Sequence, residues 1–541
     1  MTKGYLSLIL HAHLPYVRHI NQRELAEDWL YEGITETYIP LLKTFDHLYN
    51  EGIDFNITIN ISPPLAQMLQ DELIQNKYQK HIQKLIELSE KEIDRTETNP
   101  QLNHLAHMYN DIFKEAYYIF HDRYNNNLLQ GFKEMQEKGN VEIITSAATH
   151  GYLPLMFTPE TVNAQVKTGI NSYKNIFDKD PDGFWLPECG FKPDFDTILS
   201  QNEIRYFITS THGILHADPR PRYGVYAPIY TPEGVAAFGR DFESSKQVWS
   251  ADEGYPGDYN YREFYRDIGY DLDYDYVKDY LPLGIRKELG IKYHKITGET
   301  ENKDLYNPEQ ARQKAAEHAG NFMFNRQQQI KHLNQILDRK PIIVAPYDAE
   351  LFGHWWFEGP QWLEFLFKKI HHDQNDLESI TPMQYLKKYP ENQISMPSES
   401  SWGYKGYHEV WLNGSNDWIY RHLHEAELKM ISLAEKNIDL NDKQNILYRA
   451  LNQMVRELLL AQSSDWAFIL KTDTMVEYAE KRTKNHLNNF FKLSHQIENN
   501  NINQDYLKQL EDKNNIFSDI DFKIFKKQNF ESSVRAQYAS I

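Results

Sequence analysis

Residues 342–348 read Ile-Ile-Val-Ala-Pro-Tyr-Asp, an apolar run that ends abruptly in a carboxylate. Such a run is typical of a buried strand in a parallel sheet, and a polar residue at its end marks the edge where α/β folds carry their sites. The pattern recurs five times in the chain. The other runs are residues 5–10 before His11-Ala12-His13, 55–59 before Asn60, 141–145 before Thr149-His150, 183–186 before Pro187-Glu188, and 205–208 before His212.

Helical stretches lie between these runs, for example at residues 77–92 and 106–138. Alternation of strand and helix predicts a parallel α/β barrel or a doubly wound sheet. A chain of 541 residues is too long for one core, so three or four structural units are expected.

The domain organisation follows from two changes in composition. Residues 213–290 are dense in Tyr, Gly, Pro and Asp, which predicts a lid or an inserted subdomain over a site. After residue 400 helical periodicity takes over, with an apolar stripe from Ile446 to Leu458 on a helix expected to start near Asn441. We therefore expect a barrel formed by residues 1–212 and 291–400, an inserted unit at 213–290, and a helical domain at 401–541.

Charge and cysteine usage exclude several classes of partner. Lys and Arg number 58 against 77 Asp and Glu, and the net charge of −19 would repel nucleic acid and anionic lipid. The single cysteine, Cys189, excludes an intramolecular disulfide. No run of about 20 apolar residues could span a membrane, and the first residues lack the pattern of a secretory leader, so a cytoplasmic protein is expected. The oligomeric state is left open, and a monomer is compatible with the sequence.

The chain is rich in aromatic residues, with 36 Tyr, 27 Phe and 10 Trp. Sugar rings have apolar faces that stack on aromatic planes, while their hydroxyls need carboxylate, amide and imidazole partners. An acidic, tyrosine-rich surface therefore suits a carbohydrate, although aromatic residues also fill protein cores.

Glu188 lies in Phe-Trp-Leu-Pro-Glu-Cys-Gly-Phe at 184–191, where apolar neighbours would leave it poorly solvated. It is a candidate catalytic carboxylate, and the alternative is a buried glutamate neutralised by a nearby cation. Cys189 is expected to be a small packed residue and not a thiol nucleophile.

A second acid, Asp348, follows the run at 342–347 and is itself followed by His354, Trp355 and Trp356. Two strand-end acids can form the pair that retaining glycosidases hold about 5–5.5 Å apart. Glu350 competes for either role, because alternation along an extended segment would place it on the same side as Asp348.

His11 and His13 would point to the same side of a strand. The pair could bind sugar hydroxyls, could complete a Zn²⁺ site with a carboxylate from another strand, or could be structural. His150 in ATHGYLP carries the same alternatives.

In this order the motifs resemble family-57 glycoside hydrolases, and within that family the branching-type members. The segments that carry the resemblance are HAHLPY at 11–16, EIITSAATHGYLPL at 142–155, FWLPECGF at 184–191, APYDAELFGHWWFEGP at 345–360, and the later SWGYKGYHEVWLNGSNDWIY and AQSSDWAFIL. The resemblance implies an incomplete (β/α)7 barrel with a small inserted domain and a C-terminal helical domain.

The resemblance also implies a retaining mechanism that needs no metal and no cofactor, with Glu188 as nucleophile and Asp348 as acid/base. The residues it assigns to an α-glucan substrate are His11, His13, His150, Arg262, Gly284, Trp402, Trp411 and Asp465. The tyrosine near the intermediate is left open among Tyr223, Tyr226 and Tyr230.

The sequence therefore predicts a 1,4-α-glucan branching activity, which cleaves α-1,4 bonds and forms α-1,6 bonds. An α-amylase or a 4-α-glucanotransferase on the same scaffold is the first alternative. A Zn²⁺-dependent deacetylase or mannosidase-like enzyme and a non-catalytic glucan-binding protein are the others.

Overall fold

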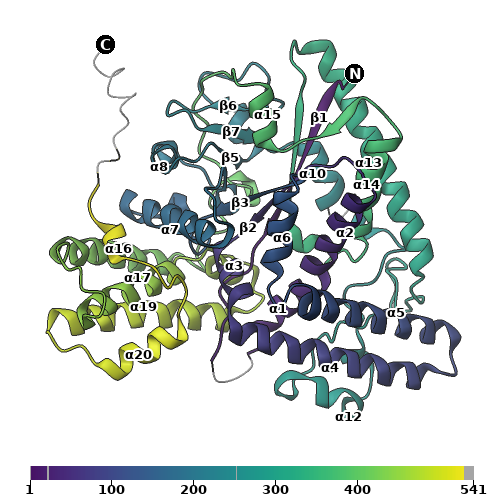
Figure 1. The fold of residues 1–541 in the computed structure, drawn as a ribbon, viewed down its shortest axis with the longest axis horizontal. Helices are drawn as coiled ribbons and strands as arrows, with labels where there is room; N and C mark the ends of the chain where they lie inside the picture. The colour runs from purple at the N-terminus through teal and green to yellow at the C-terminus, as the bar shows by residue number, and fades with distance from the viewer. Residues whose placement is uncertain (1, 21–23, 251–252, 529, 531–541) are drawn as a thin grey trace.

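The computed structural model describes residues 2–20, 24–250, 253–528 and 530, and its core is one sheet surrounded by helices (Figure 1). The strands are β1 (Gly4–Ala12), β2 (Ile57–Ile61), β3 (Val141–Ser146), β4 (Gly183–Trp185), β5 (Tyr206–Thr209), β6 (Ile229–Tyr230), β7 (Ala236–Gly239), β8 (Ile342–Asp348) and β9 (Leu377–Ser379). Their order is β6-β7-β5-β4-β3-β2-β1-β8, and β9 pairs with β1 beside this path.

Seven strands run parallel in the series β7-β5-β4-β3-β2-β1-β8, and β6 pairs antiparallel with β7. Among the described residues β8 does not pair with β7. Instead, Ile342 N donates to Tyr226 O at 2.9 Å, and Asp241 N donates to Val344 O at 2.8 Å. Isolated backbone bonds thus bridge the open side, and the prediction of an incomplete (β/α)7 barrel is confirmed.

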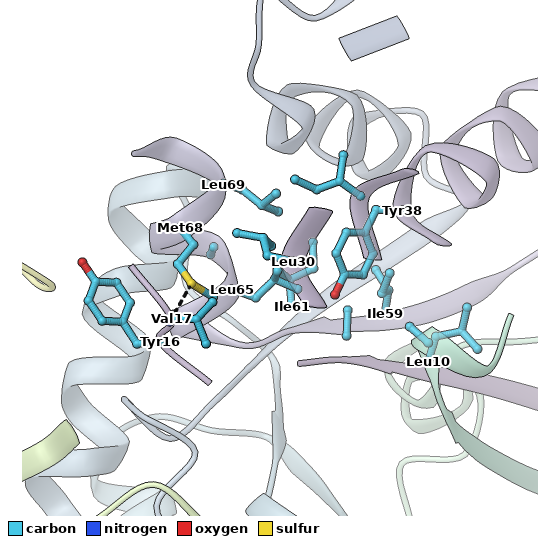
Figure 2. Close-up of a cluster of buried hydrophobic side chains, with 14 of the residues drawn as sticks. Leu10, Tyr16, Val17, Leu30, Tyr38, Ile59, Ile61, Leu65, Met68 and Leu69 are labelled. Carbon is cyan, nitrogen blue, oxygen red and sulfur yellow. Dashed lines mark hydrogen bonds between the residues drawn. The ribbon is translucent and has the colours of Figure 1, made fainter. Parts of the chain in front are cut away.

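Strand β1 lies between β2 and β8 near one end of the strand order and is buried along its whole length. It pairs with β8 from Tyr5↔Ile342 to His11↔Asp348, while β2 and β9 share its other edge. A strand covered on both faces needs a nearly continuous apolar sequence, which explains why its ionisable residue, His11, comes near the end. Figure 2 shows the apolar cluster beside it, where Leu10 lies near Ile59 and Tyr38.

The helices before residue 400 lie around the barrel (Figure 1). They are α1 (Glu27–Glu32), α2 (Ile39–Asn50), α3 (Pro63–Gln70), α4 (Glu72–Thr96), α5 (Pro100–Tyr117), α6 (Leu128–Glu137), α7 (Pro159–Phe177), α8 (Phe195–Gln201), α9 (Thr211–Leu215), α10 (Phe242–Trp249), α11 (Ile268–Asp271), α12 (Tyr274–Val277), α13 (Pro308–Ile336), α14 (Gly359–His372) and α15 (Pro382–Lys388). Of these, α4, α5 and α12 lie farther from the strands than the others. Several helices begin with a side-chain cap followed by proline, as in α13, where Asn307 accepts from Gln310 N ahead of Pro308.

The C-terminal helices gather at one corner of the molecule (Figure 1). They are α16 (Trp418–Lys436), α17 (Ile446–Ala461), α18 (Ser464–Thr472), α19 (Val476–Glu498) and α20 (Gln504–Lys513). Helix α17 is buried along most of its length and packs against α16, α19 and α20. It starts at Ile446 and not near Asn441, because Asn445 caps it by accepting from Leu447 N.

The predicted insertion at 213–290 is partly barrel, because β6 and β7 within it join the sheet. Helix α10, also within it, packs on β8. The proposed domain boundaries stay a prediction. Of the helices in the described part of the chain, none is long and apolar enough to cross a membrane.

Candidate active site

A cavity of about 460 Å³ lies where β1, β4 and β8 end, which is a usual size for a small-ligand site. Its lining residues are His11, His13, Leu14, His150, Glu188, Arg240, Trp249, Asp348, Glu350, Trp355, Trp402, Gly403, Tyr404, Val410, Trp411, Asp465 and Phe468. A larger hollow of about 710 Å³, near the start of β1 and around β9, contains none of the predicted site residues. The predicted acids and histidines therefore identify the cavity of about 460 Å³ as the candidate active site.

Glu188 follows β4 in a single turn of 3-10 helix, Pro187–Cys189. Its φ of 61° lies in the left-handed region, a conformation that costs free energy and that tertiary contacts must maintain. Trp402 N donates to Glu188 O at 3.0 Å, and the neighbouring bridge Phe191↔Ser400 holds this segment in place. The backbone of residues 400–402 thus fixes the turn that presents Glu188.

Both carboxylate oxygens of Glu188 accept hydrogen bonds. Trp402 Nε1 donates to Oε2 at 2.8 Å, and Ser464 Oγ donates to Oε1 at 2.9 Å. Burial raises the pKa of Glu188, and these two donors oppose the rise because they favour the charged form. The two donors therefore orient the carboxyl group and oppose its protonation.

Asp348 ends β8 and lies opposite His11 in the register. Burial raises its pKa well above the ordinary range, the charges of Glu350 and Glu188 raise it further, and Arg240 opposes the rise. No hydrogen bond to its carboxyl group comes from the described residues. The two acids thus differ in environment, and such a difference separates a proton donor from a carboxylate that stays charged.

Glu350 also lines the cavity, but its carboxylate is engaged. Tyr38 Oη donates to Glu350 Oε1 at 2.6 Å, and His13 N donates to the same oxygen at 3.2 Å. The strand ends at Asp348, and Glu350 lies in a 3-10 turn (Ala349–Leu351), so the alternation expected for an extended segment does not apply. The geometry favours Asp348 over Glu350 as the acid.

The three predicted histidines form a stack beside the acids. The rings of His11 and His150 are 4.9 Å apart and those of His13 and His150 are 3.8 Å apart, while His11 also lies on Trp185 at 4.4 Å. Burial lowers the pKa of His11 and of His150 well below the ordinary value. Burial would also lower that of His13, but Asp465 reverses this and raises it. The stack therefore combines one imidazole whose charged form is favoured with two whose neutral form is favoured.

Asp465 comes from α18 and binds His13. His13 Nε2 lies 3.1 Å from Asp465 Oδ2, and His13 Nδ1 lies 2.8 Å from Ser62 Oγ. Burial alone would raise the pKa of Asp465, but the charge of His13 and its hydrogen bond lower it to about 2. The pair is a partly buried ion pair at neutral pH.

The Zn²⁺ alternative can be tested on this cluster. Ligand atoms of His13, His150 and Asp465 lie within 4.8 Å of one another, whereas His11 Nδ1 accepts from Asn60 Nδ2 at 2.7 Å. An ion bound at an imidazole nitrogen lies in the plane of the ring. The planes of His13 and His150 are nearly parallel, at 21°, so the two rings as arranged do not fit a shared ion.

The predicted tryptophans lie at the cavity in different ways. Trp402 contacts Glu188, whereas Trp411 is buried with its ring stacked on Tyr152 at 4.3 Å. The large exposed rings at the rim are Trp355 and Phe468, each 45% exposed, and Tyr404, which is 69% exposed. Of these exposed rings, only Trp355 was indicated by the sequence.

Several lining residues were missed by the sequence reasoning, namely Arg240, Trp249, Tyr404 and Phe468, together with Ser464, which bonds to Glu188. Phe468 lies three residues after Asp465 on α18, and helical spacing places the two on one face. The sequence therefore contained a signal that could have identified Phe468. Arg240 and Trp249 come from residues 213–290, so the expectation that this segment contributes to the site has support in their position.

Two predicted residues do not line this cavity. Arg262 lines a separate cavity of about 370 Å³, where it lies over the Phe357 ring at 4.2 Å and donates to His354 O at 3.4 Å. Gly284 is exposed, and its carbonyl accepts from Tyr274 Oη at 3.0 Å. Their assignment to substrate stays a prediction. The candidate tyrosines Tyr223, Tyr226 and Tyr230 are likewise not among the lining residues.

The incomplete barrel and its acid-and-aromatic cavity place this chain among the glycoside hydrolases. It belongs to glycosyl hydrolase family 57, whose family model matches residues 7–397, and residues 422–525 match the model described as 1,4-alpha-glucan branching enzyme, C-terminal.

Known relatives cover nearly the whole chain. A 1,4-alpha-glucan branching enzyme of Thermococcus kodakarensis is 32% identical, over 95% of this chain and 77% of its own length. The alpha-amylase AmyC of Thermotoga maritima is similar in structure, with a TM-score of 0.91 and 46% identity over 97% of this chain and 99% of that one. The branching enzyme of Pyrococcus horikoshii has a TM-score of 0.87 and 32% identity, over 98% of both chains.

Proposed function

We propose that this protein is a retaining transglycosylase that cleaves an α-1,4 bond of a glucan and transfers the piece to a 6-hydroxyl, forming an α-1,6 bond. The observation that carries the proposal is that Glu188 and Asp348 line one cavity in contrasting environments. Burial raises the pKa of both acids, but two donors favour the carboxylate form of Glu188, whereas two negative neighbours further favour the protonated form of Asp348.

In the first step Glu188 attacks the anomeric carbon while Asp348 gives its proton to the departing glycosidic oxygen. A glycosyl ester on Glu188 forms, and the glucan beyond the cleaved bond leaves with the proton. Esterification removes the negative charge of Glu188. One cause of the high pKa of Asp348 is thereby lost, although burial and Glu350 remain.

In the second step the Asp348 carboxylate takes the proton of the acceptor hydroxyl, whose oxygen attacks the anomeric carbon and releases Glu188. The proton lost in the first step is recovered, and no net charge changes. A glucan 6-hydroxyl as acceptor gives branching, and water gives hydrolysis. The rim rings Trp355 and Phe468 are suited to stack on an acceptor glucan, which would let its 6-hydroxyl compete with water for the intermediate.

An α-amylase is the second candidate, and one observation favours it. AmyC, described as an alpha-amylase, shares 46% identity, more than either branching enzyme described above. The match to the branching-enzyme C-terminal model and the curated relative favour branching. A tenfold change in the ratio of branching to hydrolysis corresponds to a difference of about 1.4 kcal/mol between the two activation barriers.

The test is product analysis on amylose, with α-1,6 linkages quantified by ¹H NMR and by debranching, and reducing ends counted in parallel. Branching predicts new α-1,6 linkages with few new reducing ends. Reducing ends without α-1,6 linkages would assign an amylase.

Glu188→Gln and Asp348→Asn serve as the paired variants, because both keep the shape of the side chain, while the first removes the nucleophilic carboxylate and the second removes the proton-transferring carboxyl group. Either variant with wild-type turnover would refute the assigned roles. Loss of activity on chelation would favour the metal-dependent class, and binding of amylose without turnover would favour a non-catalytic glucan-binding protein.

A further inference from the structure

The first turn of α18 is attached to the end of the barrel. Ser463 forms an antiparallel bridge with Gly151, and Ser464 N donates to His150 O at 3.0 Å. This contact brings a serine hydroxyl from the helical domain to the cavity that contains the nucleophile.

Ser464 Oγ lies 2.9 Å from Glu188 Oε1 and 2.9 Å from His150 Nδ1. A hydroxyl has one hydrogen, and a carboxylate can only accept. If Ser464 donated to His150, Glu188 Oε1 would lose its donor, because His150 Nδ1 itself is 3.7 Å away. A bond to the charged carboxylate is the stronger one, so Ser464 donates to Glu188.

The tautomer of His150 then follows. Because the hydrogen of Ser464 is used, its oxygen can only accept from His150, so Nδ1 carries the hydrogen. Nε2 of the neutral ring is left unprotonated, and this buried atom has no partner among the described residues. His150 itself has a φ of 54°, which the bond from Ser464 N to its carbonyl helps to maintain.

We propose that Ser464 is a positioning residue of the transfer reaction, which orients Glu188 for attack and holds His150 as the Nδ1–H tautomer with Nε2 as an acceptor in the cavity. The proposal rests on the proposed function for its catalytic part, whereas the tautomer is a property of the protein alone. Ser464 itself touches no reacting atom.

The test compares Ser464→Ala and Ser464→Thr with a matched control, Ser494→Ala. Ser494 is a buried serine of the same helical domain, on α19, and its hydroxyl has no partner among the described residues. Steady-state kinetics on amylose are measured across pH. In parallel, ¹⁵N-histidine NMR reports the tautomer of His150, whose signals are identified by their loss in His150→Gln.

Ser464→Ala is expected to lower kcat about tenfold to a hundredfold with KM within about twofold, since one charge-assisted bond is lost. The acidic limb of kcat/KM should move to higher pH, because Glu188 loses a donor that favours its charged form. In Ser464→Ala the Nδ1–H signal of His150 should also disappear. Ser464→Thr, which keeps the hydroxyl, should retain the wild-type kinetics and the Nδ1–H signal. Ser494→Ala should match the wild type in both measurements.

An unmoved acidic limb with kcat within twofold in Ser464→Ala would overturn the positioning of Glu188. An Nε2–H tautomer of His150 in the wild-type protein would overturn the hydrogen-bond assignment. A wild-type protein without glycosyl transfer would refute the proposed function and the positioning role with it, while the NMR result would still decide the tautomer.

Discussion

Replacing Trp402 with phenylalanine removes one of the two donors to Glu188 and keeps an aromatic ring. The bond lost runs from Nε1 to Glu188 Oε2 at 2.8 Å, while Ser464 still donates to the other oxygen and the backbone bond from Trp402 N to Glu188 O remains. A hydrogen bond to a charged group contributes about 1.5–3 kcal/mol, so kcat/KM should fall about tenfold to 150-fold.

The pH dependence should change in a defined direction. The bond from Trp402 lowers the pKa of Glu188, so its loss raises that pKa, and Glu188 is then protonated at higher pH. The acidic limb of kcat/KM for transfer on amylose should therefore move upward. Trp418→Phe is the control, a half-buried tryptophan of α16 outside the cavity. A Trp402→Phe variant with kcat/KM within twofold of the wild type and an unmoved acidic limb would refute the reasoning.

Three further outcomes are expected. Asp348→Asn should lower kcat about 10²-fold to 10⁴-fold, which kinetics on amylose will measure; a smaller loss would remove it from the acid/base role. Glu350→Gln keeps the acceptor for Tyr38 but removes a charge that raises the pKa of Asp348, so the alkaline limb of kcat/KM should move to lower pH; an unmoved limb would contradict this. Asp465→Asn should lower the free energy of unfolding by about 2 kcal/mol, because the depression of its pKa from 3.8 to about 2 corresponds to about 1.4 kcal/mol per tenfold change in proton affinity. A carboxyl whose pKa is depressed on folding stabilises above its unfolded value, so denaturant unfolding should show the full loss above about pH 4 and a vanishing loss below about pH 2; an equal loss at both would be inconsistent with the ion pair.

Much of the barrel could be predicted because burial constrains β1 and β8 so strongly. A strand covered on both faces must be apolar until it ends, so the position of His11 and Asp348 in the sequence also gave their place at the mouth of the barrel. The parallel register then brings the two residues opposite each other. Local sequence is sufficient to place both residues at strand ends, but not to predict that β1 and β8 pair in this register.

The donors to Glu188 could not be predicted in the same way. Trp402 and Ser464 lie 214 and 276 residues after Glu188, and their contacts depend on how two later segments pack on the barrel. The resemblance indicated Trp402 as a substrate contact and did not indicate its bond to the carboxylate. The resemblance also indicated Arg262 as a substrate contact and did not indicate its contacts with His354 O and the Phe357 ring.

Because α18 contributes Ser464 and Asp465, the active site is complete only when this late segment of the chain packs on the barrel. A chain that has folded only through β8 contains both acids but lacks the Ser464 hydroxyl that donates to Glu188 Oε1 and the Asp465 carboxylate that binds His13. Detachment of α18 alone would have the same effect. On heating, we therefore expect glucan transfer to fail at a lower temperature than the far-UV circular dichroism of the barrel, and coincident transitions would show that α18 and the barrel unfold as one unit.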